Sequence, residues 1–90
     1  MSNFISLSSL AMDLDRVSMG LHWKSDAMAE RFIKEALERK KEIDIYMVKP
    51  YVAHLLGKME LALQSGDREK KAEDALMYST LFQNAALAAK

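Results

Sequence analysis

The sequence predicts an all-α protein, a compact bundle of about four helices arranged as two packed antiparallel helical hairpins. Apolar residues recur at steps of three and four along successive segments, which is the spacing of helices that pack on one another. Only three glycines and one proline occur in the chain, as suits a helix-rich protein. The connections between the helical segments are short, so neighbouring helices are expected to run roughly antiparallel.

Length and composition indicate one helical domain spanning residues 1–90, too short for two independent cores. Half of the residues are apolar and 29% are charged, which is the composition of a folded domain rather than a disordered chain. Lys+Arg and Asp+Glu balance at 13 each, so the basic excess usual in nucleic-acid binders is missing and we expect no nucleic-acid partner. No apolar run approaches the ~20 residues of a membrane span, so we expect no membrane partner.

The chain contains no cysteine, which excludes disulfides and thiolate chemistry. Small secreted domains often depend on disulfides, so we expect a cytoplasmic protein. The first ten residues carry no basic cluster followed by a long apolar run, and we therefore expect no signal peptide.

We expect the first helix over residues 7–22, after a frayed lead-in at residues 1–4. Its apolar residues recur at steps of three and four and form one packing seam: Leu7, Leu10, Leu14, Val17 and Leu21. Three serines near its start are candidate N-caps, because each hydroxyl can accept a bond from a free amide of the first turn: Ser6, Ser8 and Ser9. Three charged residues lie off the seam: Asp13, Asp15 and Arg16.

Gly20 and residues 22–26 predict a break, after which Ser25 or Asp26 can cap a second helix over residues 26–44. One bent, continuous helix is the alternative, because no residue at the break forbids helical dihedrals. The second helix carries a charged face that we interpret as solvated: Glu30, Arg31, Lys34, Glu35, Glu38, Arg39, Lys41 and Glu42.

Pro50 suits the first position of a third helix, expected over residues 50–64. Gly66 then predicts a helix end, and Asp67 is the expected N-cap of a fourth helix over residues 67–88.

The stretch from residue 72 to residue 89 has apolar or small residues on nearly every side and no charge between Asp74 and Lys90. A helix that is apolar all round needs cover all round, so we expect it to be the central helix or part of a subunit interface. Gln83 and Asn84 lie among its apolar residues, and we expect their amides to bond across helices of one chain or across a two-fold axis.

Sites for metals, cofactors and catalysis are not indicated. The only histidines are His22 and His54, and neither has a second histidine or a carboxylate at a ligand-like spacing, so we expect no metal and no cofactor. Three isolated glycines cannot form a phosphate-binding loop, and the serines cluster where capping explains them.

Arg16 and His22 enclose five residues, an Arg-x5-His spacing. This spacing resembles the signature of the HEPN ribonucleases, small helical domains that cleave RNA with an Arg and a His in a dimer cleft. The resemblance covers seven residues and implies that Arg16 and His22 are catalytic. It departs from the family in lying in the first helix, and no basic surface for RNA accompanies it. The other interpretation places Arg16 on a solvated outer face.

We therefore expect a non-catalytic interaction or scaffold protein that acts through an apolar helical surface and self-associates as a homo-oligomer, with another protein as a further candidate partner. The alternatives are the small helical ribonuclease and a small-ligand carrier with a pocket between helices. The expected interface residues are Trp23, Tyr78, Leu81, Phe82, Asn84 and Leu87.

Overall fold

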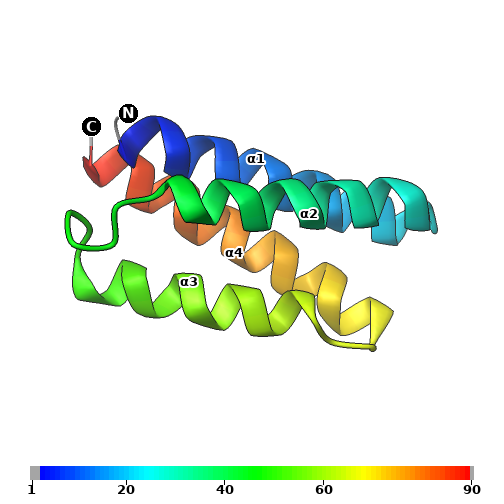
Figure 1. Cartoon of the computed structure of the whole chain (residues 1–90). Coiled ribbons are helices and arrows are strands. Elements are labelled where there is room, and N and C mark those ends of the chain that lie inside the picture. The colour runs from blue at the N-terminus through cyan, green and yellow to red at the C-terminus, as the bar shows by residue number, and fades with distance from the viewer. Residues whose placement is uncertain (1–2, 90) are drawn as a thin grey trace.

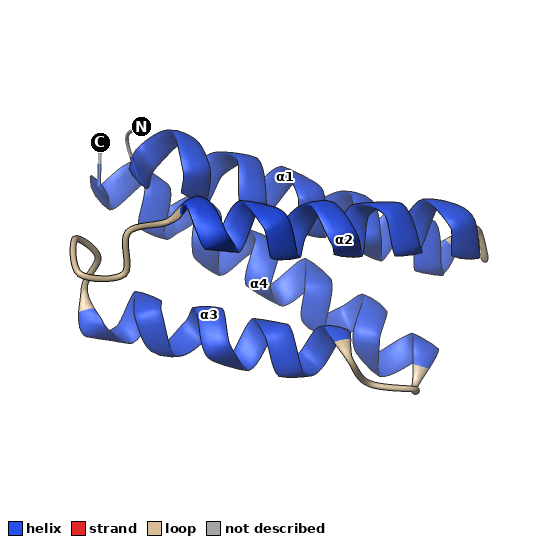
Figure 2. Cartoon of the chain, viewed as in Figure 1, coloured by secondary structure: helices blue, strands red, loops and turns tan. Residues whose placement is uncertain are grey.

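A computed structural model describes residues 3–89 of the chain and confirms the predicted all-α class (Figure 1). No strand occurs within these residues, and the connections between the helices are short apart from residues 43–49 (Figure 2). Successive helices run in opposite directions, so the start of the first helix and the end of the last lie at one end of the bundle. The helices are α1 (Asn3–His22), α2 (Asp26–Glu42), α3 (Pro50–Leu63) and α4 (Arg68–Ala89).

The centre of the fold is α1, which packs along both α2 and α4. On the other side of α4 lies α3, and α2 and α3 meet only weakly. Nine residues of α1 are buried but only five of α4, so the prediction that the last helix is central was wrong. The apolar residues of α4 are divided between an inner face and an outer face, and on the outer face Leu76, Met77 and Leu87 are exposed.

The core is built on the predicted seam of α1. Leu10, Leu14 and Val17 are wholly buried, and the remaining seam residues, Leu7 and Leu21, are nearly so. The other helices contribute mainly small and aliphatic residues and one aromatic ring to the same core, namely Ala29, Ala36, Val52, Leu56, Met59, Ala75 and Phe82.

The first helix begins four residues earlier than predicted, at Asn3. Phe4 packs against the core and extends the apolar pattern by one step of three from Leu7, so the chain is already helical there. Ser6, Ser8 and Ser9 consequently lie inside the helix, and their assignment as N-caps was wrong. Residues 1 and 2 of the expected lead-in are outside the described residues.

Two separate helices follow one another at the first break, which excludes the single bent helix. Lys24 adopts a left-handed backbone with a φ of 58°. The amide of Ser25 donates to the Gly20 carbonyl at 2.8 Å, and the amide of Lys24 donates to the Leu21 carbonyl at 3.2 Å. This bond pair is the Schellman motif, which satisfies the last carbonyls of a helix and stops it.

The other helix ends agree with the sequence to within one or two residues, and two predicted signals are confirmed. Pro50 occupies the first turn of α3. The Asp67 carboxylate accepts a bond from the Lys70 amide at 3.1 Å, as an N-cap of α4 does.

Gly20 serves a purpose other than the predicted break, because it lies inside α1 where that helix meets α2. A Cβ atom at this position would lie 2.9 Å from the backbone nitrogen of Ala29. The missing side chain therefore allows the two helices to approach closely. Gly57 differs, because no atom lies within 4 Å of a Cβ placed there.

A matched pair of glycine substitutions tests this close approach. Gly57→Ala is expected to raise the free energy of unfolding by about 0.5–1 kcal/mol, because alanine restricts the unfolded chain and favours helix. Gly20→Ala is expected to lower it by about 1–3 kcal/mol, because the added methyl group meets backbone rather than a movable side chain. Urea unfolding followed by circular dichroism measures both. Equal stabilisation by the two substitutions would show that α1 and α2 do not approach so closely.

Candidate functional site

Exposed apolar side chains gather along the outer faces of α1 and α4. Ile5 and Met12 are seven residues apart and exposed on one face of α1, and Trp23 is exposed directly after the helix ends at His22. On α4, Leu76 and Leu87 are also eleven residues apart, and both are more than half exposed. Large exposed side chains therefore form two parallel rows on this outer surface and are not scattered singly over it.

Between these rows lies a shallow groove. Two hollows of about 280 Å³ and 320 Å³ follow one another along α1 and α4, and both are lined by Asp15. We call this continuous feature the outer groove. Its larger apolar side chains are Met12, Met19, Trp23 and Leu76, and its polar side chains include Asp15, His22, Glu73, Thr80, Gln83 and Asn84.

Small residues form the floor of the outer groove, where α1 and α4 come closest. The Ser18 hydroxyl donates to the Ala72 carbonyl at 2.9 Å, and the Ser79 hydroxyl donates to the Ala11 carbonyl at 2.7 Å. Each helix thus contributes one serine and one acceptor, seven residues apart in the sequence. Side chains of this size leave the larger methionine, tryptophan and leucine side chains standing as walls above the floor.

The outer groove has an acidic character. Asp15 and Glu73 are both exposed, and neither forms an ion pair with another residue in the range 3–89. The carboxylates of Glu60 and Asp74, in contrast, have lysine partners at 3.1 Å. Among the residues that the structure describes, no lysine or arginine lines the groove.

The predicted interface residues separate into surface and core positions. Trp23 is 63% exposed and lines the outer groove, Asn84 is exposed and lines it too, and Leu87 is exposed further along the same helix. Tyr78 and Phe82 are buried in the core, where their rings stack with centroids 6.1 Å apart.

Burial within their own chain leaves Tyr78 and Phe82 unavailable to a partner of the folded protein. Leu81 is half-buried against the core. Gln83 and Asn84 are both exposed, so water can satisfy their amides and neither amide needs a partner inside its own chain. A bond of these amides across a two-fold axis stays a prediction. Some residues of the last helix face the core and others face solvent. The composition of this stretch does not show which residue does which.

The pair that resembles the HEPN signature is not assembled within one chain. The Arg16 guanidinium lies over the ring of Phe32 in α2, 5.4 Å from its centroid. His22 is exposed on the α4 side, in the same hollow as Trp23 and Leu76. Six residues of helix turn the two side chains to different faces, so they share no cleft. The stacking on Phe32 also leaves Arg16 half-buried instead of solvated.

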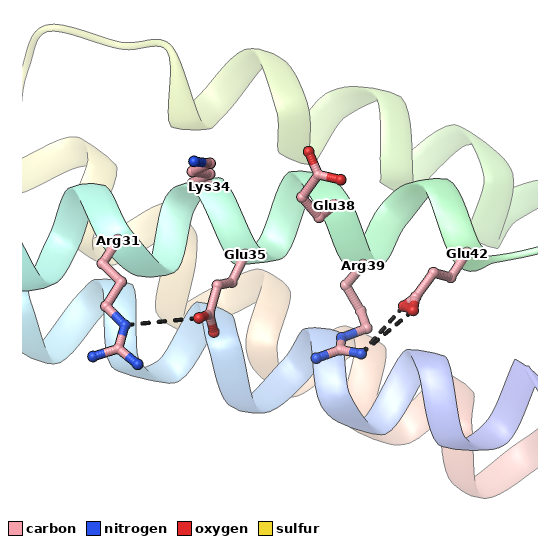
Figure 3. Close-up of a pocket in the computed structure, with 6 residues that line it drawn as sticks. All are labelled: Arg31, Lys34, Glu35, Glu38, Arg39 and Glu42. Carbon is pink, nitrogen blue, oxygen red and sulfur yellow. Dashed lines mark hydrogen bonds and ion pairs between the residues drawn. The ribbon is translucent and has the colours of Figure 1, made fainter.

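A charged hollow of about 580 Å³ lies along α2 and is lined by that helix alone (Figure 3). Its cations and anions neutralise one another, as in the ion pairs of Arg31 with Glu35 at 3.7 Å and of Arg39 with Glu42 at 3.1 Å. Such a surface is the solvated face predicted for this helix, and pairs of this kind contribute little to stability.

A smaller apolar hollow of about 140 Å³ lies where residues 47–52 meet the end of α4. Pockets for small organic ligands typically measure about 300–1,000 Å³. Its size therefore does not favour the small-ligand carrier.

Asp13 is a buried carboxyl group, although the sequence places it off the apolar seam. Its Oδ2 atom lies 3.7 Å from Nε of Arg39, too far for a hydrogen bond. Burial raises the pKa of the Asp13 carboxyl above its ordinary value of 3.8, and the positive charge of Arg39 opposes part of the rise. Because α2 covers this side of α1, the residue is hidden by tertiary packing that a single-helix pattern cannot show.

Within residues 3–89, no three His, Cys, Asp or Glu side chains lie close enough together to hold a metal ion. Among the same residues, no helix is both long and apolar enough to span a bilayer.

Comparison with protein-family models, with curated proteins and with solved structures found no match to this chain.

Of the residues that line the outer groove, the sequence selected Trp23 and Asn84 and missed the others. A signal for the floor was present, because Ala11 and Ser18 and also Ala72 and Ser79 are small residues seven apart. No comparable signal marks Met12 or Leu76, because an exposed and a buried apolar residue look alike in the sequence.

The burial of Asp13 predicts a specific pH dependence of stability. A carboxyl whose pKa is raised by folding destabilises the folded state as pH rises from the unfolded pKa of about 3.9 through the folded pKa. Asp13→Asn is therefore expected to gain stability relative to wild type between pH 3.5 and pH 7. Urea unfolding at both pH values measures this gain, and Asp15→Asn is the control for loss of a surface carboxylate. A stability difference between Asp13→Asn and wild type that does not change with pH would contradict a raised pKa of the Asp13 carboxyl.

Proposed function

We propose that this chain is a non-catalytic interaction protein that binds a helix of another protein in the outer groove. One observation carries the proposal: the exposed apolar residues of α1 and α4 form two rows on either side of a groove with a small-residue floor. Exposed apolar surface that is contiguous and bordered by polar residues is typical of a binding site.

The shape and chemistry of the groove suit a helical partner. On α1 its lining runs from Ala11 to His22, a stretch of helix that extends over about 17 Å. An amphipathic helix laid in such a groove contacts it through side chains at intervals of three and four. Methionines such as Met12 and Met19 adapt to different partner side chains, and Trp23 is a residue type enriched among energetically dominant contacts.

Self-association through the groove is disfavoured by its charges. If two copies met through this face, Asp15 and Glu73 of both would enter one interface, and among the described residues neither groove supplies a lysine or arginine to pair with them. Carboxylates removed from water without a partner are costly.

The predicted homo-oligomer would then use a different surface. The connection between α2 and α3 exposes Ile45, Tyr46 and Met47, and Tyr46 is 91% exposed. Bonds between Asn3 and the backbone of Asp44 hold the start of this connection against α1. We propose this connection as the self-association surface, and a cytoplasmic location as the setting, which the lack of cysteine supports.

The homo-oligomer has a direct test in light scattering over a concentration series. Self-association through the α2–α3 connection is expected to raise the average mass of wild type with concentration, while Tyr46→Ser stays at the mass of one chain. Tyr51→Ser, at the start of α3, is the neighbouring control. A wild-type mass that stays at one chain up to high concentration would remove the homo-oligomer.

Binding in the groove is tested by substituting one wall residue and one matched residue elsewhere. Leu76→Gln changes an exposed groove residue, and Leu61→Gln changes a residue of α3 that is 70% exposed and outside the groove. Both tagged variants and wild type are purified from the cell that makes the protein, and co-purifying proteins are identified by mass spectrometry.

A partner that is retained by wild type and Leu61→Gln and lost by Leu76→Gln is the expected result. Circular dichroism checks that both variants stay folded. If Leu76→Gln retains every partner that wild type retains, the groove is not the binding surface.

A further inference from the structure

We infer that the partner of the outer groove is a basic amphipathic helix, one with lysines or arginines beside its apolar face. The inference rests on the proposed function of the groove and adds the chemistry of its occupant. It depends on three features: the position of the groove carboxylates, the lack of ion pairs to them within residues 3–89, and the charge of this chain's own helices.

The two carboxylates lie on opposite sides of the groove. Asp15 comes from α1 and Glu73 from α4, and both line the same hollow as Trp23 and Leu76. A helix placed over the apolar floor and walls would therefore have an acidic group along each of its flanks. Cationic side chains at the edges of its apolar face would meet both.

The groove carboxylates have no ion-pair partner in the described part of the chain. Other carboxylates form ion pairs: Asp26 pairs with Arg68, Glu42 with Arg39 and Glu60 with Lys40. Within residues 3–89, Asp15 and Glu73 form no ion pair, and the groove is lined by no lysine or arginine. Complementary charge across an interface selects among partners and speeds their encounter, so an unneutralised acidic rim favours cations.

None of this chain's own helices carries an excess of basic residues. In α2 five acidic residues accompany five basic ones, and in α4 three accompany three. A single lysine and a single glutamate balance in α3, and α1 carries two aspartates against one arginine. A helix from a second copy would bring as much negative as positive charge to the groove, so the occupant comes from a different molecule.

Trp23 provides a direct readout, because it is the only tryptophan in the chain and it lines the groove. The probe is a synthetic amphipathic peptide of about 18 residues built from leucine and lysine, without aromatic residues. A peptide of the same pattern with glutamate in place of lysine is the matched control. Binding is followed by the fluorescence of Trp23 and by calorimetry at low and high salt.

The lysine peptide is expected to bind saturably with a blue shift of Trp23 emission, and the glutamate peptide about tenfold more weakly or not at all. The double variant Asp15→Asn with Glu73→Gln is expected to bind the lysine peptide about threefold to tenfold more weakly, because exposed ion pairs are individually weak. High salt is expected to shrink this difference. Leu61→Gln is expected to bind as wild type does.

The outcomes separate the charge assignment from the groove itself. If both peptides bind wild type equally, or the double variant loses no affinity for the lysine peptide, the inference of a basic partner is wrong. The proposal that the groove binds a helix is then unaffected. If Leu76→Gln binds the lysine peptide as tightly as wild type and Trp23 does not respond, the groove proposal fails as well. If the isolated chain dimerises and Leu76→Gln abolishes the dimer, the occupant is a second copy and the inference is overturned.

Discussion

The close approach of α1 and α4 is the constraint on which the rest of the structure depends. Alanines and serines meet along this contact, and two hydroxyls, those of Ser18 and Ser79, bond to backbone carbonyls of the opposite helix. On the inner side, the contact brings the leucine seam of α1 against Phe82 and so builds the core. On the outer side, it leaves a floor of small residues between two rows of larger ones. Core and groove are therefore two faces of one helix pair.

The same arrangement explains why the last helix is apolar nearly all round without being central. Its inner residues, such as Tyr78 and Phe82, fill the bundle, whereas Leu76 and Leu87 stand on the outer face. Burial of the inner residues supplies the stability, since each large apolar side chain contributes about 1.5–3 kcal/mol. The outer residues contribute little to folding of the single chain. Their exposure is understandable if another helix covers them, which is the role we propose for the groove.

The sequence predicted the helices well because local signals determine them. Pro50, Asp67 and the spacing of Leu7, Leu10 and Leu14 act within one or two turns, and the structure bears out each. Such local signals do not determine how the helices pack against one another. Asp13 was placed off the seam but is covered by α2, and Gly20 was interpreted as a break but allows α1 and α2 to approach. The residues Met12, Asp15 and Glu73 can be assigned to a groove only when the packing of α1 on α4 is known.

The most direct test of a helix-binding groove is a map of where a helix binds. Backbone amide chemical shifts of the labelled protein, recorded by NMR during titration with the leucine–lysine peptide, give such a map residue by residue. Binding in the groove predicts that the largest changes fall on α1 and α4 around Met12, Met19, Leu76 and Thr80, with α3 and the charged face of α2 unchanged. Changes centred on the α2–α3 connection or spread evenly over the bundle would contradict it.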